Sequence, residues 1–137
     1  MAETSITIRN DTSEIRRLAK WAGLFCEEHQ LGLTENRLTL VLEELLTNVI
    51  SYGYDDDDSH EINVDLKIKD GILTSIFDDG GRPFDPHEAQ KPDMDGPLED
   101  RSVGGLGIHL ILTIMDTVDY ERVDGRNRTT MTMAIAP

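Results

Sequence analysis

The sequence has 137 residues, of which 38% are hydrophobic, 29% charged and 5% aromatic, a composition that predicts one soluble globular domain with an aliphatic core. Thirteen basic and 27 acidic residues give a net charge of −14, which disfavours direct binding to nucleic acid and to anionic membranes because like charges repel. A single cysteine, Cys26, excludes an internal disulfide, and the chain shows neither an export signal nor an apolar run of the roughly 18 residues that span a bilayer. We therefore expect a cytoplasmic protein whose residues 1–137 form a single domain.

The first half of the chain predicts a strand followed by two helices. Apolar and polar residues alternate over 5–9, and a helix is expected from the cap candidates at 10–13 to about His29. A second helix is expected from Thr34 to Gly53. Apolar residues recur every three or four positions in both helices, at Ile15, Leu18, Ala19, Ala22 and Phe25 in the first and at Leu38, Val41, Leu42, Leu45, Leu46 and Val49 in the second. The acidic run 55–58 is interpreted as a solvated loop, with a metal site as the less favoured alternative.

The second half predicts strands around one long loop. Residues 62–68 alternate strictly and a second strand follows over 73–77, so that the turn at 69–71 closes a hairpin. Five glycines and four prolines interrupt residues 79–105, which are too long for an ordinary connection and are interpreted as containing a lid at about 85–104. A helix over 106–115 and strands over 118–123 and 129–135, joined by residues 124–127, complete the pattern. This order predicts an α+β fold, a two-layer α/β sandwich with a mixed, mostly antiparallel sheet and helices on one face.

Three short segments carry residues suited to chemistry. Glu44 and Asn48 lie four apart on the second helix, so both point to one side, where a carboxylate could act as a general base beside an oxygen ligand for Mg²⁺. Asp78 and Asp79 end a strand before two glycines, and a carboxylate there can accept a hydrogen bond from an exocyclic amine. The glycine-rich segment 104–107 opens a helix, whose free N–H groups suit phosphate.

Each of these segments also has a plain structural interpretation. Glutamate and asparagine on the edge of a helix are often only solvated, the aspartates can cap a turn, and the glycines can form a hinge that binds nothing. No lysine follows the glycines and the spacing is not that of a dinucleotide fingerprint, so the P-loop and dinucleotide-binding folds are disfavoured.

The order and spacing of the three segments together resemble those of the GHKL ATPases. Residues 44–48 (ELLTN) resemble the N box, residues 79–84 (DGGRPF) the first glycine box and residues 104–107 (GGLG) the second. Within that superfamily the chain is most similar to the bacterial anti-sigma factor serine/threonine kinases of the RsbW type, because the segments SYGY at 51–54, RPFDP at 82–86, GGLGIHL at 104–110 and DGRNR at 124–128 are typical of them. The resemblance departs at Val103 and Pro83, each of which stands where many relatives have glycine.

The resemblance implies a role for each matching residue. Glu44 would be the catalytic base, and Asn48 would hold the Mg²⁺ that accompanies ATP. Asp79 would recognise adenine, in preference to Asp78 because only that register places Gly81 two residues on, where it lets adenine approach the backbone. The remaining nucleotide-binding positions implied by the resemblance are Gly104, Gly105, Leu106 and Gly107 at the phosphates and Thr129, which would support the adenine-site carboxylate. Arg101 could reach a terminal phosphate, but it is left outside the core site.

The resemblance also implies an activity. The expected function is transfer of the ATP γ-phosphoryl to a serine or threonine of a small STAS-type (anti-anti-sigma) partner, with a sigma factor regulated by partner switching. The alternative is a nucleotide-dependent binding protein without significant kinase activity. A histidine kinase fragment is disfavoured because no helix pair with a phosphoacceptor histidine precedes the N box. A homodimer is compatible with the resemblance, and the composition does not decide it.

Overall fold

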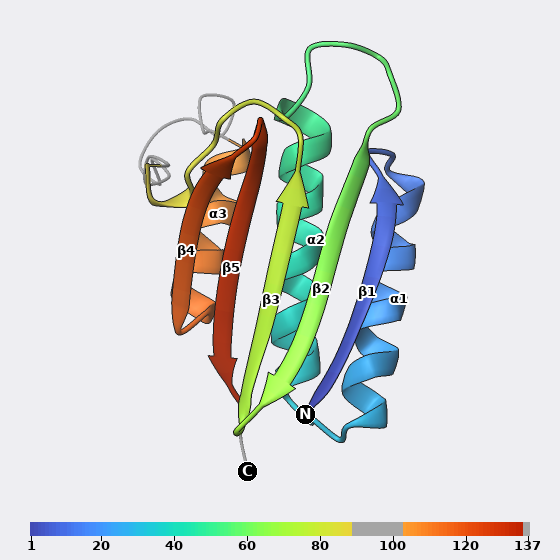
Figure 1. The fold of residues 1–137 in the computed structure, drawn as a ribbon, viewed down its shortest axis with the longest axis vertical. Helices are drawn as coiled ribbons and strands as arrows, with labels where there is room; N and C mark the ends of the chain where they lie inside the picture. Colours follow the sequence, from blue (N-terminus) through green and yellow to red (C-terminus); the bar gives the residue numbers. More distant parts are fainter. Residues whose placement is uncertain (89–102, 136–137) are drawn as a thin grey trace.

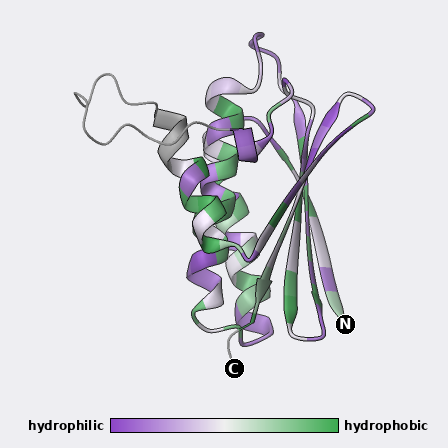
Figure 2. Cartoon of the chain, turned by 90° about the vertical axis from the view of Figure 1, so that its left-hand side faces the viewer, coloured by the Kyte–Doolittle hydropathy of each residue, from purple (hydrophilic) through white to green (hydrophobic). Residues whose placement is uncertain are grey.

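A sheet and a layer of helices pack face to face in the computed structural model, which describes residues 1–88 and 103–135 (Figures 1 and 2). This is the two-layer α+β architecture that the order of elements predicts. In chain order the elements are β1 (Ala2–Arg9), α1 (Ser13–Glu28), α2 (Thr34–Tyr52), β2 (Glu61–Lys69), β3 (Ile72–Asp79), the short 3₁₀ helix η1 (Pro86–Glu88), α3 (Val103–Ile114), β4 (Thr117–Val123) and β5 (Arg126–Ala134).

The five strands are arranged in the order β1-β2-β3-β5-β4, and all four pairings are antiparallel. The predicted sheet, mixed and mostly antiparallel, is thus antiparallel at every pairing of the described strands. The two hairpins β2–β3 and β4–β5 reverse direction at tight turns, and the chain between β1 and β2 reverses three times, into α1, into α2 and into β2. An even number of helices between two neighbouring strands makes the second strand run opposite to the first.

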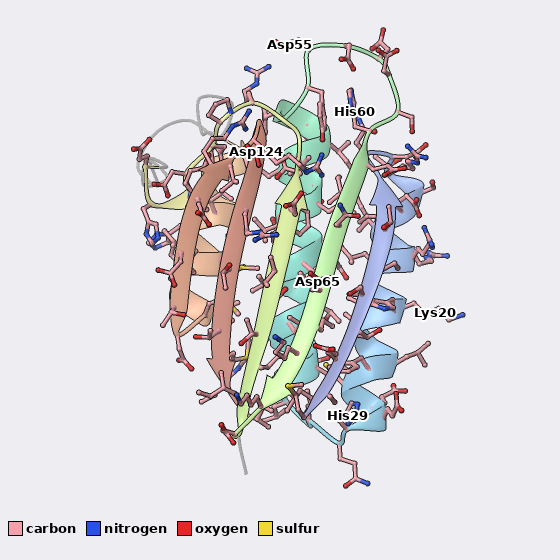
Figure 3. All side chains as sticks on the ribbon, viewed as in Figure 1. Lys20, His29, Asp55, His60, Asp65 and Asp124 are labelled. Atoms are coloured by element: carbon pink, nitrogen blue, oxygen red, sulfur yellow. The ribbon has the colours of Figure 1, made fainter. Side chains whose placement is uncertain are left out.

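The core lies between the helices and one face of the sheet. All six apolar residues predicted for α2 are buried, whereas the α1 stripe is buried at Leu18, Ala22 and Phe25 and only half-buried at Ile15 and Ala19. The sheet contributes every second residue, as the period of a strand requires. Ile62, Val64 and Leu66 of β2 are fully buried, while the residues between them, Asp65 among them, lie on the open face (Figure 3).

The β4–β5 hairpin differs from its prediction. Only Asp124 and Gly125 form the turn, with φ of 50° and 78°. Two consecutive residues with positive φ are typical of the tight turn that matches the twist of two antiparallel strands, and aspartate and glycine tolerate that backbone conformation better than most residues. The prediction of a four-residue connection is therefore wrong, and β5 begins at Arg126 rather than at Thr129. This shift places Asn127 inside the sheet, directly opposite Asp79 of β3.

Three connections gather at one end of the molecule: the α2–β2 loop, the β3–η1 segment and the β4–β5 turn (Figure 3, near the labels Asp55, His60 and Asp124). The aspartates at 55–58 are exposed, as the interpretation of a solvated loop requires. His60 anchors this loop, since its ring stacks on Tyr54 with 3.9 Å between centroids and its Nε2 lies 2.7 Å from Asp56 Oδ1. None of the described helices is long and apolar enough to cross a membrane.

Candidate functional site

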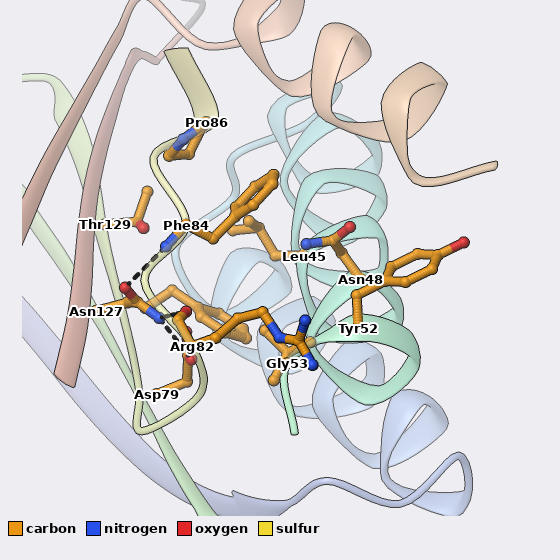
Figure 4. A pocket seen from close by; sticks show the side chains of 12 residues that line it. Leu45, Asn48, Tyr52, Gly53, Asp79, Arg82, Phe84, Pro86, Asn127 and Thr129 are labelled. Atoms are coloured by element: carbon orange, nitrogen blue, oxygen red, sulfur yellow. Dashed lines mark hydrogen bonds between the residues drawn. The ribbon is translucent and has the colours of Figure 1, made fainter. Parts of the chain in front are cut away.

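A pocket opens at this end between α2, the end of β3 and the start of β5 (Figure 4). Its floor is formed by the sheet, one wall by the last two turns of α2, and the other by the segment that follows β3. The described residues that line it are Leu45, Asn48, Val49, Tyr52, Gly53, Phe77, Asp79, Arg82, Phe84, Pro86, Asn127 and Thr129. Two of the predicted motifs, the N box and the first glycine box, therefore share one pocket, although they lie far apart in the chain.

Asp79 is the buried carboxylate of this pocket, with 5% of its surface exposed. Its Oδ1 accepts two hydrogen bonds, from the Gly81 N–H at 2.9 Å and from Asn127 Nδ2 at 3.1 Å. Among the described residues, no group donates to Oδ2. Burial raises the pKa of Asp79 above its ordinary value, and the two donors together with Arg126 offset only part of that rise. The side chain thus keeps one oxygen as an acceptor for a further donor.

Asp78 points the other way, because successive side chains in a strand face opposite sides of the sheet. It forms an ion pair with Arg126 Nε and lies 3.8 Å from Arg128 Nε. Of the two adjacent aspartates, only Asp79 lines the pocket.

Gly81 lies where any side chain would collide with its surroundings. A Cβ at this position would lie 2.8 Å from the Gly53 carbonyl oxygen and 3.0 Å from Asp79 Oδ1. The next residue ties the same two segments together, since the Arg82 N–H donates to the Gly53 carbonyl at 2.8 Å. The first glycine box is therefore fixed against the carboxyl end of α2, because the missing side chain lets the backbone at 81 pack closely against Gly53.

Asn127 holds this loop from the other side. Its Nδ2 donates to Asp79 Oδ1 and to the Arg82 carbonyl at 2.8 Å, and its Oδ1 accepts from the hydroxyl of Tyr120, from Arg122 Nη1 at 3.1 Å and from the Phe84 N–H at 3.3 Å. Arg122 Nη1 also donates to the Gly81 carbonyl at 2.8 Å. The sequence analysis missed these three side chains, Asn127, Tyr120 and Arg122. The signal that could have found Asn127 is the Asp124-Gly125 pair, since a two-residue turn extends β5 back to it.

Glu44 lies one turn of α2 before Asn48, at the contact between α2 and α3. The Glu44 carboxylate approaches Gly107 so closely that a Cβ on Gly107 would overlap its Oε2. Gly107 thus leaves room for the Glu44 side chain beside the first turns of α3. Gly104, Gly105 and Leu106 belong to the first turn of the same helix, which begins three residues earlier than predicted.

Thr129 is buried at 4% exposure and lines the pocket two residues beyond Asn127. The described side-chain donor to Asp79 is Asn127, and no described hydrogen bond joins Thr129 to that carboxylate. Arg101 and most of the segment predicted as a lid, residues 89–102, lie outside the described residues.

The pocket is narrow as it stands. Its cavity volume is about 60 Å³, well below the ~300 Å³ at which ordinary ligand pockets begin. Phe84 and Tyr52, which are 36% and 48% exposed, stand at its mouth, and the Phe84 ring lies beside Leu45 and Asn48 (Figure 4). A nucleotide base can therefore enter only if side chains at the mouth move.

The chain is similar in sequence to proteins named as serine or serine/threonine kinases. The chain is 31% identical to the serine/threonine-protein kinase BtrW of Bordetella bronchiseptica over 100 residues, which cover 73% of this chain and 70% of that protein. It is 32% identical to the serine-protein kinase RsbW of Bacillus licheniformis over 85 residues, which cover 59% of this chain and 53% of that protein. It is 30% identical to RsbW of Bacillus subtilis over 94 residues, which cover 64% of this chain and 58% of that protein. The alignments with the two RsbW proteins thus span little more than half of their length.

Solved structures share the fold. The RsbU and RsbW domains of Rv1364c from Mycobacterium tuberculosis superpose with a TM-score of 0.68 at 15% identity, covering the whole of this chain and 34% of that one. The histidine kinase domain of the blue-light activated kinase EL346 from Erythrobacter litoralis gives a TM-score of 0.57 at 15% identity, with 90% and 60% covered. The family model of the histidine kinase-like ATPase domain matches residues 7–133. The chain therefore belongs to the histidine kinase-like ATPase domain family, within the GHKL superfamily that its motifs predict.

Proposed function

We propose that this protein is an ATP- and Mg²⁺-dependent serine/threonine protein kinase of the anti-sigma type, which phosphorylates a STAS-type partner in the cytoplasm and regulates a sigma factor by partner switching. The relatives named as serine and serine/threonine kinases support the reaction class. The observation that carries the proposal is the buried Asp79 carboxylate, which has one oxygen saturated by protein donors and the other left as an acceptor in the pocket.

The geometry around Asp79 suits an adenine base. A carboxylate acceptor pairs with the exocyclic amine of adenine, and a buried hydrogen bond to a charged group is strong because the pocket excludes water. Gly81 fixes the loop beside Asp79, because only a residue without a Cβ can pack against the Gly53 carbonyl at the end of α2. The residues present therefore fit a nucleotide, with Phe84 and Leu45 offering apolar contact to the base.

The phosphates would lie toward the start of α3. Asn48 lines the pocket on the side of α2, and its amide oxygen is the hard ligand that Mg²⁺ prefers. The first turn of α3 contains Gly104 and Gly105, and its free N–H groups attract anions. Bound Mg²⁺ would neutralise charge on the transferred phosphoryl group.

Glu44 is suited to accept the proton of the attacking hydroxyl. It lies on the same side of α2 as Asn48 and beside Gly107, so its carboxylate stands next to the expected phosphate position. In phosphoryl transfer the protein mainly positions the reactants and stabilises charge, and a base of this kind orients the hydroxyl. The net charge of −14 does not oppose this function, because the substrate would be a protein and not a nucleic acid.

Nucleotide binding is tested by titration calorimetry of the purified chain with an ATP analogue and Mg²⁺, beside Asp79→Asn and Asn48→Ala. We expect saturable binding that both substitutions weaken by about tenfold or more, since each removes a charged or metal-bound contact of ~1.5–3 kcal/mol. Absence of binding at millimolar analogue would contradict the proposed nucleotide site.

The role of Glu44 is tested by Glu44→Gln. We expect phosphorylation of a STAS-type protein to fall ~10²–10⁴-fold, while affinity for the ATP analogue and for the partner stays within about threefold because the amide keeps the shape of the side chain. Glu43→Gln is the matched control, since Glu43 lines the groove between α1 and α2 instead of the pocket. Equal transfer by Glu44→Gln and the wild type would favour the alternative of a nucleotide-dependent binding protein.

A further inference from the structure

We propose that Asn127, held by Tyr120 and Arg122, is a positioning residue that makes the pocket select an amino purine over an oxo purine. It acts through Asp79, by keeping that carboxylate as an acceptor in a fixed orientation. The inference rests on the proposed function, because it concerns the base of the nucleotide that would occupy this pocket.

The orientation of the Asn127 amide is determined by its neighbours. Its Oδ1 accepts hydrogen bonds from three groups: the hydroxyl of Tyr120, Arg122 Nη1 and the Phe84 N–H. The last two can only donate. The opposite orientation would put the Asn127 NH₂ group against an arginine N–H and a backbone N–H. Both of these groups can only donate, so no hydrogen bond could form. The NH₂ group must therefore face Asp79 Oδ1 and the Arg82 carbonyl, where both of its hydrogens find acceptors.

This amide is one of the groups that favour the carboxylate form of Asp79. Burial favours the neutral carboxyl, while the donors Asn127 and Gly81 N–H favour the carboxylate. The other ionisable groups near Asp79 are Arg126, which favours the carboxylate, Asp78, which disfavours it, and Tyr54. With Oδ1 occupied by two donors, an ionised Asp79 presents Oδ2 as an acceptor. Such an oxygen pairs with the 6-amino group of adenine and repels the 6-oxo group of guanine.

The β-sheet supplies the rigidity that selection needs. Asn127 is 3% exposed and lies opposite Asp79 in the β3–β5 ladder, and Arg122 lies opposite Asn127 in the β4–β5 ladder. Tyr120 and Arg122 lie outside the set of residues that line the pocket. They would affect the base only through Asn127 and the loop that it holds, which is the behaviour of a supporting shell around a binding site.

The test is Asn127→Asp, which keeps the size of the side chain and replaces the donor by an acceptor. Affinities for ATP and GTP with Mg²⁺ are measured by calorimetry, and KM and kcat by phosphorylation of the partner. The wild type is expected to prefer ATP. In the variant we expect ATP affinity to fall about tenfold or more and the ratio of ATP to GTP affinity to fall with it, while KM for ATP rises and kcat at saturating ATP is retained.

The pH dependence gives a signature that a purely structural role would not produce. In the variant two carboxylates face each other, and one proton shared between them restores a donor to Asp79. ATP affinity of Asn127→Asp is therefore expected to recover as the pH is lowered from neutral, whereas wild-type affinity does not rise. Asn36→Asp, on an exposed position at the other end of α2, makes the same change of charge and is the matched control.

The outcomes distinguish a failure of the proposed function from a failure of the selection by Asn127. If the wild type binds neither nucleotide, the proposed function fails. If the wild type binds ATP but does not prefer it over GTP, or if Asn127→Asp keeps the wild-type ratio, the selection by Asn127 is overturned. Should Asn127→Asp fail to fold, Tyr120→Phe removes one donor to Asn127 without touching Asp79. We expect Tyr120→Phe to lower the ratio of ATP affinity to GTP affinity, and an unchanged ratio would overturn the inference.

Discussion

At the scale of single residues, Asp79 is in an environment that opposes its charge. Burial raises the pKa of its carboxyl, and the hydrogen bonds from Asn127 and the Gly81 N–H compensate in part. A carboxyl group in a buried position is more often suited to binding than to stability, because burial costs free energy whenever the group is charged. Function and stability are therefore expected to respond in opposite directions to a change at this residue.

Replacing Asp79 with asparagine tests this opposition. Because the pKa of Asp79 in the folded chain lies above its ordinary value of 3.8, the folded state binds the proton more tightly than the unfolded state, and stability falls as the pH rises through the folded pKa. The side-chain oxygen of the new asparagine would keep both hydrogen bonds without the charge. We expect the nucleotide-free variant to melt at or above the wild-type temperature at neutral pH, with the advantage disappearing below pH 3.8.

Calorimetric melting curves over a pH series, beside nucleotide titrations, give both readouts. Asp78→Asn is the control, since it removes the ion pairs with Arg126 and Arg128 on the other side of the sheet and should leave nucleotide affinity nearly unchanged. A lower melting temperature for Asp79→Asn at neutral pH would mean that hydrogen bonding to the carboxylate outweighs the cost of burial.

At the scale of elements, the site depends on one junction between a helix end and a loop. The carboxyl end of α2 meets the segment after β3, where the Arg82 N–H donates to the Gly53 carbonyl. Asp55 in the loop after α2 also forms an ion pair with Arg82, although both side chains are largely exposed, so we ascribe little stability to it. The close backbone packing at Gly81 is the stronger constraint, because backbone atoms cannot move aside as a side chain can.

Two adjacent glycines allow a paired test of this junction. In Gly81→Ala the new Cβ would meet the Gly53 carbonyl at 2.8 Å, so we expect a loss of ~1–3 kcal/mol in the free energy of unfolding, together with loss of nucleotide binding. In Gly80→Ala the Cβ would meet only the end of the flexible Arg126 side chain, at 3.0 Å, so stability should change by less than about 1 kcal/mol.

Urea unfolding and nucleotide titration of both alanine variants measure these effects. Similar losses in Gly80→Ala and Gly81→Ala would show that the β3–η1 segment is sensitive to any side chain, and that the contact with Gly53 is not the cause.

At the scale of the whole molecule, negative charge dominates the surface. A net charge of −14 on 137 residues makes self-repulsion an unfavourable term in folding. Ions screen that repulsion, since the Debye length falls to ~10 Å at 0.1 M salt. The same surface favours partners with basic docking faces, and such association is expected to weaken as salt rises.

Salt should therefore stabilise the chain in the absence of ligand. We expect the melting temperature to rise by about 2–8 °C between ~10 mM and ~300 mM NaCl, measured by circular dichroism at neutral pH. Asp57→Asn, which removes one charge from the exposed acidic loop, should melt slightly higher than the wild type at low salt and match it at high salt. A melting temperature that falls with salt would mean that ion pairs such as that of Arg9 with Glu61 contribute more than the net repulsion.

Local patterns were enough to predict most elements. The apolar stripe of α2 and the alternation over 62–68 depend on neighbours three, four or two residues away, so the helix and the β2–β3 hairpin follow directly from the chain. The sequence predicts a start of β5 three residues late, because the polar residues Arg126 and Asn127 are typical of a loop and are included in the predicted connection 124–127. Register with β3 places those polar residues in the sheet, and register depends on a strand far away in the chain.

The order of the elements predicted the fold class, the composition predicted the acidic surface, and the resemblance of three motifs predicted the family to which the family model over residues 7–133 assigns the chain, because each of these is read along the chain in order. Folding in three dimensions then established which of two adjacent aspartates faces the pocket, that Glu44 lies against Gly107, and that Asn127 holds Asp79. Those facts arise from strand register, helix packing and the close approach of Gly81 to Gly53, which are contacts between segments far apart in the chain that no local pattern specifies.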